Sequence, residues 1–142
     1  MPPLVVDAGL VFRLLLPTPA QALLREHIDA WLQDGGALVA PTLWRYELVS
    51  ALVKAVHFAT LTDEEARRAL GLVDAFPVEL IVPDARLSEA AYGWGRRLQR
   101  ANAYDAFYLA LAEALRCELW TADRRLARAA QQPWIRLIGD SS

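Results

Sequence analysis

The sequence is poor in the residues from which disulfides and zinc sites are built. Its 142 residues include a single cysteine, Cys117, and only two histidines, His27 and His57. One cysteine cannot close an internal disulfide, and these three side chains are too few for a structural zinc site. The chain also has no recognisable Ser-His-Asp set and no glycine-rich phosphate loop, so nothing in it favours those two kinds of chemistry.

Strong net charge and long apolar runs are also missing. The formal net charge is −2, so no global basic field attracts nucleic acid. Fourteen of the fifteen Lys and Arg residues are arginines, and Lys54 is the only lysine. A GC-rich genome explains this excess of arginine better than a functional choice does. The apolar runs are too short and too often broken by proline to span a bilayer, and Asp7 interrupts the first of them. We therefore expect a cytoplasmic protein with no membrane partner.

The composition and the pattern of the chain predict a single α/β domain over residues 1–142. Apolar residues make up 55% of the sequence, and this length allows one sizeable core. Short β-branched runs alternate with longer helical patterns, which indicates a mostly parallel sheet covered on both faces. We expect strands at 4–7, 37–40, 78–82, 118–120 and 134–138, and helices at 10–16, 19–34, 41–57, 62–76, 84–100, 104–115 and 123–130.

Four acidic residues interrupt apolar or small-residue stretches: Asp7, Glu47, Asp105 and Asp123. A carboxylate removed from water is costly unless a cation compensates its charge. In open α/β sheets, ligands bind beyond the carboxyl ends of the strands. If the first and fourth strands are central neighbours, all four acids can converge on one edge of the sheet.

Such a pocket suits hard cations, because Mg²⁺ and Mn²⁺ prefer oxygen ligands. A cation held there can help to deprotonate a water for in-line attack on a phosphodiester and neutralise the transition state. Metal-assisted hydrolysis is therefore the chemistry that the four acids favour.

Each acid also has a structural interpretation. Asp105 and Asp123 could cap or charge helix N-termini, and Glu47 could pair with a nearby basic residue such as Arg45. Asp7 is the hardest to explain in this way, because it follows two valines inside an expected strand. The four together favour a common pocket over four coincidences.

Four sequence blocks resemble the PIN domain, and in particular the VapC-type toxins of bacterial toxin–antitoxin pairs. They are Val-Val-Asp-Ala at 5–8, Pro-Thr-Leu-Trp-Arg-Tyr-Glu-Leu at 41–48, Tyr-Asp-Ala-Phe-Tyr-Leu-Ala-Leu-Ala at 104–112 and Leu-Trp-Thr-Ala-Asp-Arg-Arg-Leu at 119–126. The resemblance runs through the whole chain in order. The Tyr-Asp-Ala and Thr-Ala-Asp segments are its more specific parts.

This resemblance implies an α/β/α sandwich with strand order 3-2-1-4-5. It also implies a Mg²⁺- or Mn²⁺-dependent endoribonuclease that forms a homodimer and is inhibited by a small cognate antitoxin. Asp7, Glu47, Asp105 and Asp123 match the family's acidic positions, as catalytic residues and metal ligands. One departure stands out, because the family usually has Ser or Thr where this chain has Gly9.

Two alternatives differ in function class. A receiver domain needs an acid pair after the first strand and a lysine after the last, and this chain has neither. A PIN-fold module that binds RNA or protein without catalysis stays open, and divalent-metal binding would distinguish it from the enzyme. The apolar composition and five tryptophans predict a homodimer and an antitoxin groove walled by helices between Pro19 and Ala59. Arg13 and Arg45 either face the acidic site and contact RNA phosphate or lie on the surface.

Overall fold

The computed structural model describes residues 1–16, 19–100 and 102–138. The described strands form one parallel sheet in the order β3-β2-β1-β4-β5. This arrangement confirms the predicted α/β class and strand order. The strands are β1 (Leu4–Val6), β2 (Leu38–Pro41), β3 (Val78–Ile81), β4 (Glu118–Thr121) and β5 (Ile135–Leu137). The helices are α1 (Ala8–Leu15), α2 (Pro19–Gln33), α3 (Leu43–His57), α4 (Asp63–Ala75), α5 (Ala85–Arg97), α6 (Tyr104–Leu115) and α7 (Arg124–Ala130).

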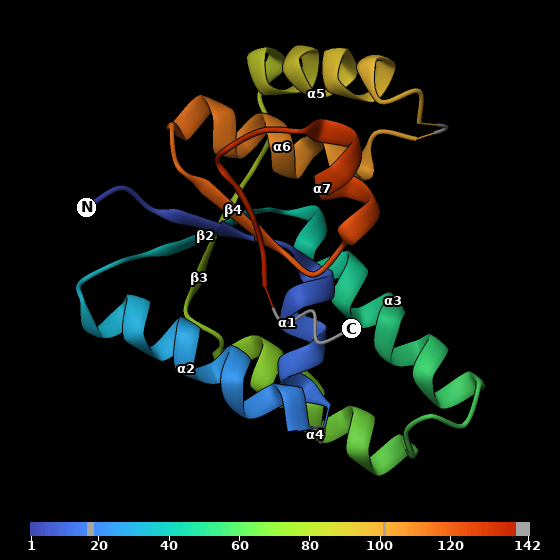
Figure 1. Ribbon diagram of the computed structural model, residues 1–142. Coiled ribbons are helices and arrows are strands. Elements are labelled where there is room, and N and C mark those ends of the chain that lie inside the picture. The colour runs from blue at the N-terminus through green and yellow to red at the C-terminus, as the bar shows by residue number, and fades with distance from the viewer. Residues whose placement is uncertain (17–18, 101, 139–142) are drawn as a thin grey trace.

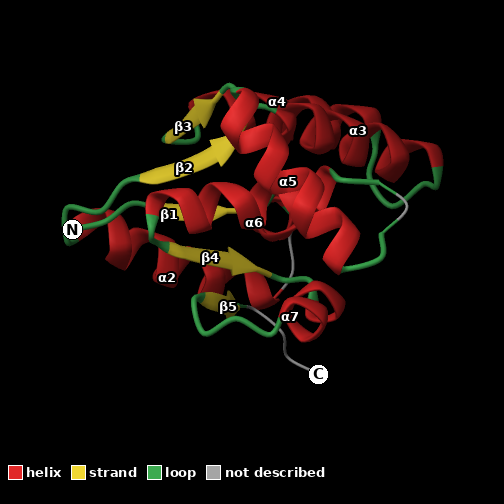
Figure 2. Cartoon of the chain, turned by 90° about the horizontal axis from the view of Figure 1, so that it is seen from above, coloured by secondary structure: helices red, strands yellow, loops and turns green. Residues whose placement is uncertain are grey.

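Helices cover both faces of the sheet. Figure 1 shows α5, α6 and α7 above the strands and α1, α2 and α4 below them, while α3 extends to the right. Figure 2 shows the arrowheads of β2 and β4 pointing to the same edge of the sheet, away from the N-terminus. Because the paired strands are all parallel, their carboxyl ends lie together at this edge.

The core lies around β1 and α6. Residues 4–6 are fully buried, which explains why β1 is a continuous apolar run and not an alternating one. Helix α6 is buried over most of its circumference, as its nearly uniform apolar sequence predicts. A second, smaller cluster joins the outer halves of α3 and α4, and it consists of Leu52, Ala55, Leu61, Ala66 and Ala69.

Side-chain caps set several helix starts. The predicted capping box at the start of α4 is present, with Thr62 and Glu65 bonded to each other's backbone N–H groups. Asp84 caps α5 in the same general way. Asp7 corrects an expectation, because β1 ends at Val6 and Asp7 is the N-cap of α1 rather than a strand residue. Within the described ranges, none of the helices is both long and apolar enough to cross a membrane.

Candidate active site

The carboxyl edge of the sheet brings the four acidic residues to one pocket. Strands β1 and β4 are neighbours, with Val6 paired to Trp120, so the segments that follow them lie side by side. Asp7 and Asp123 are in those segments, while Glu47 comes from α3 and Asp105 from the first turn of α6. All four line a pocket of about 270 Å³, together with Ala8, Gly9, Arg13, Tyr108 and Ala122.

Asp7 is the most buried of the four acids, with 8% of its surface exposed. Its Oδ1 accepts a 2.7 Å hydrogen bond from the backbone N–H of Leu10, and its Oδ2 accepts one from the Thr121 hydroxyl. Burial raises the pKa of Asp7 from 3.8 to about 6; the two hydrogen bonds oppose this rise, and the charges of Asp105 and Asp123 add to it. Asp7 is thus held in place but is costly to ionise.

Thr121 joins the two acids that follow neighbouring strands. Its hydroxyl donates to Asp7 and accepts a 2.9 Å hydrogen bond from the backbone N–H of Asp123. Asp123 in turn caps α7, where its Oδ1 accepts a 3.0 Å bond from the N–H of Leu126. The capping role that the sequence left open for Asp123 is therefore present, and it leaves the residue in the pocket.

Glu47 is fixed by Tyr108, a residue that sequence reasoning missed. The Tyr108 hydroxyl donates a 2.7 Å hydrogen bond to Glu47 Oε1. Burial raises the pKa of Glu47; the Tyr108 bond lowers it and the charge of Asp105 raises it further. Burial also holds the pKa of Tyr108 far above its ordinary value, as does the adjacent Glu47 carboxylate, so the phenol stays a neutral donor. The sequence feature that could have pointed to it is the hydroxyl of Tyr108, a polar group three residues after Asp105 in a mostly apolar helix.

Asp105 lies at the start of α6, as the sequence placed it, and does not act as the cap. Burial raises its pKa, and the negative charge of Asp123 raises it further, while Arg100 lowers it. The Arg100 guanidinium is 4.0 Å from Asp105 Oδ2, and both side chains are partly exposed. An arginine that reaches the rim of an acidic pocket is suited to bind a phosphate there.

The two arginines considered from the sequence have different positions. Arg13 lines the pocket. Arg45 does not: its guanidinium lies 2.5 Å from Asp74 of α4, so of the two positions left open by the sequence it has the one on the surface. Glu47 is hydrogen-bonded to Tyr108 instead of to this arginine.

Gly9 leaves open space beside the most buried acid. A Cβ added there would meet only Asp7 Oδ1, at an ordinary contact distance of 3.7 Å. Sterically, a serine or threonine Cβ would therefore fit at this position, so packing does not explain why the chain has glycine in place of the hydroxyl residue expected from the resemblance.

The donor chemistry of the pocket fits a divalent cation. The oxygens that line it are mainly those of carboxylates, which Mg²⁺ and Mn²⁺ prefer. Neighbouring negative charges raise the pKa of Asp7, Glu47 and Asp105, a repulsion that a cation relieves. As they stand, the described His, Cys, Asp and Glu side chains include no group of three close enough to hold an ion. The four acids therefore share a pocket without forming a closed cage.

Comparison with known proteins gives consistent matches along the chain. The family model described as PIN domain matches residues 4–132. Ribonuclease VapC1 of Mycobacterium tuberculosis is 38% identical over 137 residues, which cover 91% of this chain and 92% of that protein.

Solved structures share the fold. PAE2754 from Pyrobaculum aerophilum superposes with a TM-score of 0.69 at 24% identity, over 95% of this chain and 83% of that one. VapBC-1 from nontypeable Haemophilus influenzae gives a TM-score of 0.65 at 18% identity, over 94% and 96% of the two chains.

Proposed function

Because this chain belongs to the PIN domain family, we propose that it is a metal-dependent endoribonuclease and the toxin of a bacterial toxin–antitoxin pair. The observation that carries the proposal is the pocket in which Asp7, Glu47, Asp105 and Asp123 meet from four separate segments. The ribonuclease name of its 38% identical relative supports the reaction class. Residues 1–142 act as one domain in this proposal, and action on cellular RNA places it in the cytoplasm.

The residues of the pocket have three proposed roles: binding the cation, orienting the carboxylates and binding the phosphate. Asp7 and Asp105, with Glu47 and Asp123, provide the oxygen ligands, and a bound divalent cation supplies activation of water and charge neutralisation at the phosphate. Thr121 holds Asp7, and Tyr108 holds Glu47, so both carboxylates keep a fixed orientation before substrate arrives. Arg13 lines the same pocket and is placed to bind the phosphate beside the acids.

The antitoxin has a candidate binding surface in the groove between α3 and α4. Six apolar residues line this groove of about 310 Å³: Val49, Leu52, Val53, Val56, Ala66 and Leu70. One wall is α3, which lies within the segment expected from the sequence, and the other is α4, beyond Ala59. The toxin–antitoxin complexes among the structural neighbours support a protein partner for this fold. An apolar helix of the antitoxin fits a groove of this kind.

A homodimer remains part of the proposal. Light scattering at micromolar concentration tests it, since a monomer at that concentration would contradict the dimer.

The antitoxin is tested by co-expression with the adjacent gene product. A single inactive complex supports it, whereas separate elution with full nuclease activity contradicts it.

The metal requirement is tested by RNA cleavage in different divalent ions. Cleavage should stop in EDTA and return with Mg²⁺ or Mn²⁺. Ca²⁺ should restore it poorly, because it favours a larger and looser ligand shell. Undiminished cleavage in EDTA would exclude the proposed mechanism, whereas RNA binding without cleavage in any ion would favour the non-catalytic module.

A further inference from the structure

Two tyrosines on one face of α6 have opposite environments. Tyr108 is 2% exposed and its hydroxyl lies in the acidic pocket, bonded to Glu47. Tyr104 precedes it by four residues and is 62% exposed. Residues four apart lie on the same side of a helix, and side chains lean toward its N-terminus. Tyr104 therefore lies one turn outward from Tyr108 on the same side of α6, at the end of the helix that begins beside the pocket.

The start of α6 holds Tyr104 in position without burying its ring. The backbone N–H of Tyr104 donates a 3.2 Å hydrogen bond to Asn102 Oδ1, and the next residue, Asp105, lines the pocket. A single exposed ring is common on protein surfaces and needs no explanation by itself. Two facts make this ring informative: it lies one turn outward from Tyr108, whose hydroxyl is in the pocket, and it precedes the proposed catalytic Asp105 in the sequence.

Two arginines lie near the same acids. Arg100 lies 4.0 Å from Asp105, and Arg13 lines the pocket. Aromatic rings that stack on bases, next to arginines that bind the backbone, are typical of sites for single-stranded nucleic acid.

The exposure of the Tyr104 ring favours a contact with an unpaired base. An A-form duplex presents its bases stacked and enclosed, whereas a single strand can turn a base outward onto an aromatic ring. The ring of Tyr104 is the exposed aromatic surface that such a base would meet at the start of α6.

We propose that Tyr104 is a stacking platform for an unpaired base next to the cleaved phosphate, with Arg100 binding the adjoining backbone. This inference rests on the proposed ribonuclease function and specifies how its site recognises RNA.

The test measures RNA binding separately from cleavage. Fluorescence anisotropy is recorded with a labelled single-stranded oligoribonucleotide, with Ca²⁺ as the divalent ion so that the RNA stays intact. Tyr104→Ala should weaken binding by about 5- to 100-fold, the loss expected for one stacked base. Tyr104→Phe keeps the ring and should bind like the wild type. Tyr92→Ala is the matched control, since Tyr92 is 67% exposed on α5, a helix that contributes no residue to the pocket.

A second oligonucleotide locates the contact. With an abasic site next to the cleaved position, wild type and Tyr104→Ala should bind equally, because the stacked base is gone from both complexes. A paired version of the same RNA should bind more weakly than the single strand.

The outcomes separate this inference from the function on which it rests. If the wild type cleaves and binds single-stranded RNA while Tyr104→Ala binds equally well, only the stacking inference is overturned. Equal weakening by Tyr104→Ala and Tyr92→Ala also overturns it. A wild-type protein that neither binds nor cleaves RNA overturns both.

Discussion

The acidic pocket and the apolar groove between α3 and α4 have opposite environments: charged groups are buried in the first, and apolar groups are exposed in the second. In the pocket, carboxylates are withdrawn from water, and the pKa values of Asp7, Glu47 and Asp105 are raised. In the groove, apolar side chains stay in water, and Val53 on its wall is 64% exposed. A bound cation would compensate the buried negative charge of the pocket, and an apolar partner would remove the exposed side chains of the groove from water.

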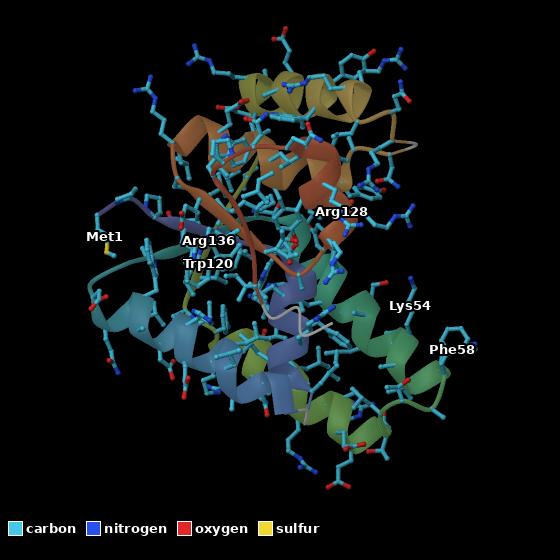
Figure 3. All side chains as sticks on the ribbon, viewed as in Figure 1. Met1, Lys54, Phe58, Trp120, Arg128 and Arg136 are labelled. Atoms are coloured by element: carbon cyan, nitrogen blue, oxygen red, sulfur yellow. The ribbon has the colours of Figure 1, made fainter. Side chains whose placement is uncertain are left out.

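Helix α3 takes part in both regions. Near its start, Trp44 and Leu48 are buried in the main core and Glu47 lines the pocket. Its outer half packs in the smaller cluster with α4, against which Phe12 of α1 also packs. Figure 3 shows Lys54 and Phe58 at this outer end, away from the sheet. The difference predicts that catalysis and partner binding can be altered independently by substitutions on a single helix.

The largest effect should come from the acids themselves. Asp105→Asn, and likewise Asp7→Asn, Glu47→Gln and Asp123→Asn, should lower RNA cleavage by about 100-fold or more. The melting temperature should be unchanged or higher, because removing one charge reduces repulsion in the pocket. Cleavage of a fluorogenic RNA and thermal denaturation measure the two effects. Variants that unfold, or that keep their activity, would show that the acids are structural.

The next effect concerns pH and stability. Since the pKa of Asp7 is raised from 3.8 to about 6, the folded state binds its proton more tightly than the unfolded chain does. Stability from this group is complete below the lower value and is lost as pH rises through the upper one. Asp7→Asn keeps a good N-cap and lacks this loss, so in EDTA it should be more stable at pH 7.5 by at most ~3 kcal/mol.

Chemical denaturation of both proteins across pH checks this expectation. The two should be nearly equally stable in acid and should diverge as pH rises. Val53→Ala, in the groove, serves as the control and should show no pH-dependent difference from the wild type in this range. An advantage of Asp7→Asn that is constant with pH would contradict the assigned pKa shift.

A smaller loss is expected for Tyr108→Phe. This change removes the hydroxyl that orients Glu47 and leaves the ring in the core. Loss of a group that orients a metal ligand typically costs about 10- to 100-fold in activity or metal affinity. Metal titration and cleavage rates of Tyr108→Phe measure both, and wild-type values for the two would show that Glu47 needs no such support.

A substitution in the groove between α3 and α4 should weaken antitoxin binding without changing RNA cleavage. Val53→Glu places a charge on its apolar wall and should weaken antitoxin binding by about 10-fold, a cost of ~1.4 kcal/mol, while cleavage by the free protein stays unchanged. Val82→Glu is the matched control, because Val82 is 76% exposed and lies outside the groove. Isothermal titration with the antitoxin distinguishes the two variants. Equal binding by both would show that the groove is not the docking surface.

Local signals allowed much of the fold to be predicted. The box formed by Thr62 and Glu65 fixed the start of α4, and the uniform apolar sequence of α6 predicted its burial. The strand order required the resemblance to a known family, because short apolar strands carry no information about their neighbours. Asp7 was placed in the strand because it directly follows the apolar run of residues 4–6, whereas in the structure it caps the helix that begins at Ala8.

The site was harder to predict where its contacts join distant segments. Tyr108 and Glu47 are 61 residues apart in the sequence, and only the packing of α6 near α3 brings them together. Arg45 pairs with Asp74 for the same reason, since α4 folds back along α3. Periodicity places a side chain on a face of its helix, but it does not say which helix that face will meet.

Calorimetric titration of Mn²⁺ is the most direct test of the claim that the four acids form one metal-dependent site. We expect the wild type to bind the ion with measurable heat and Asp105→Asn to bind it much more weakly. The ion should also raise the melting temperature of the wild type alone, because only the assembled pocket binds it. Equal Mn²⁺ binding by the two proteins, or none by either while RNA is still cleaved, would contradict the claim.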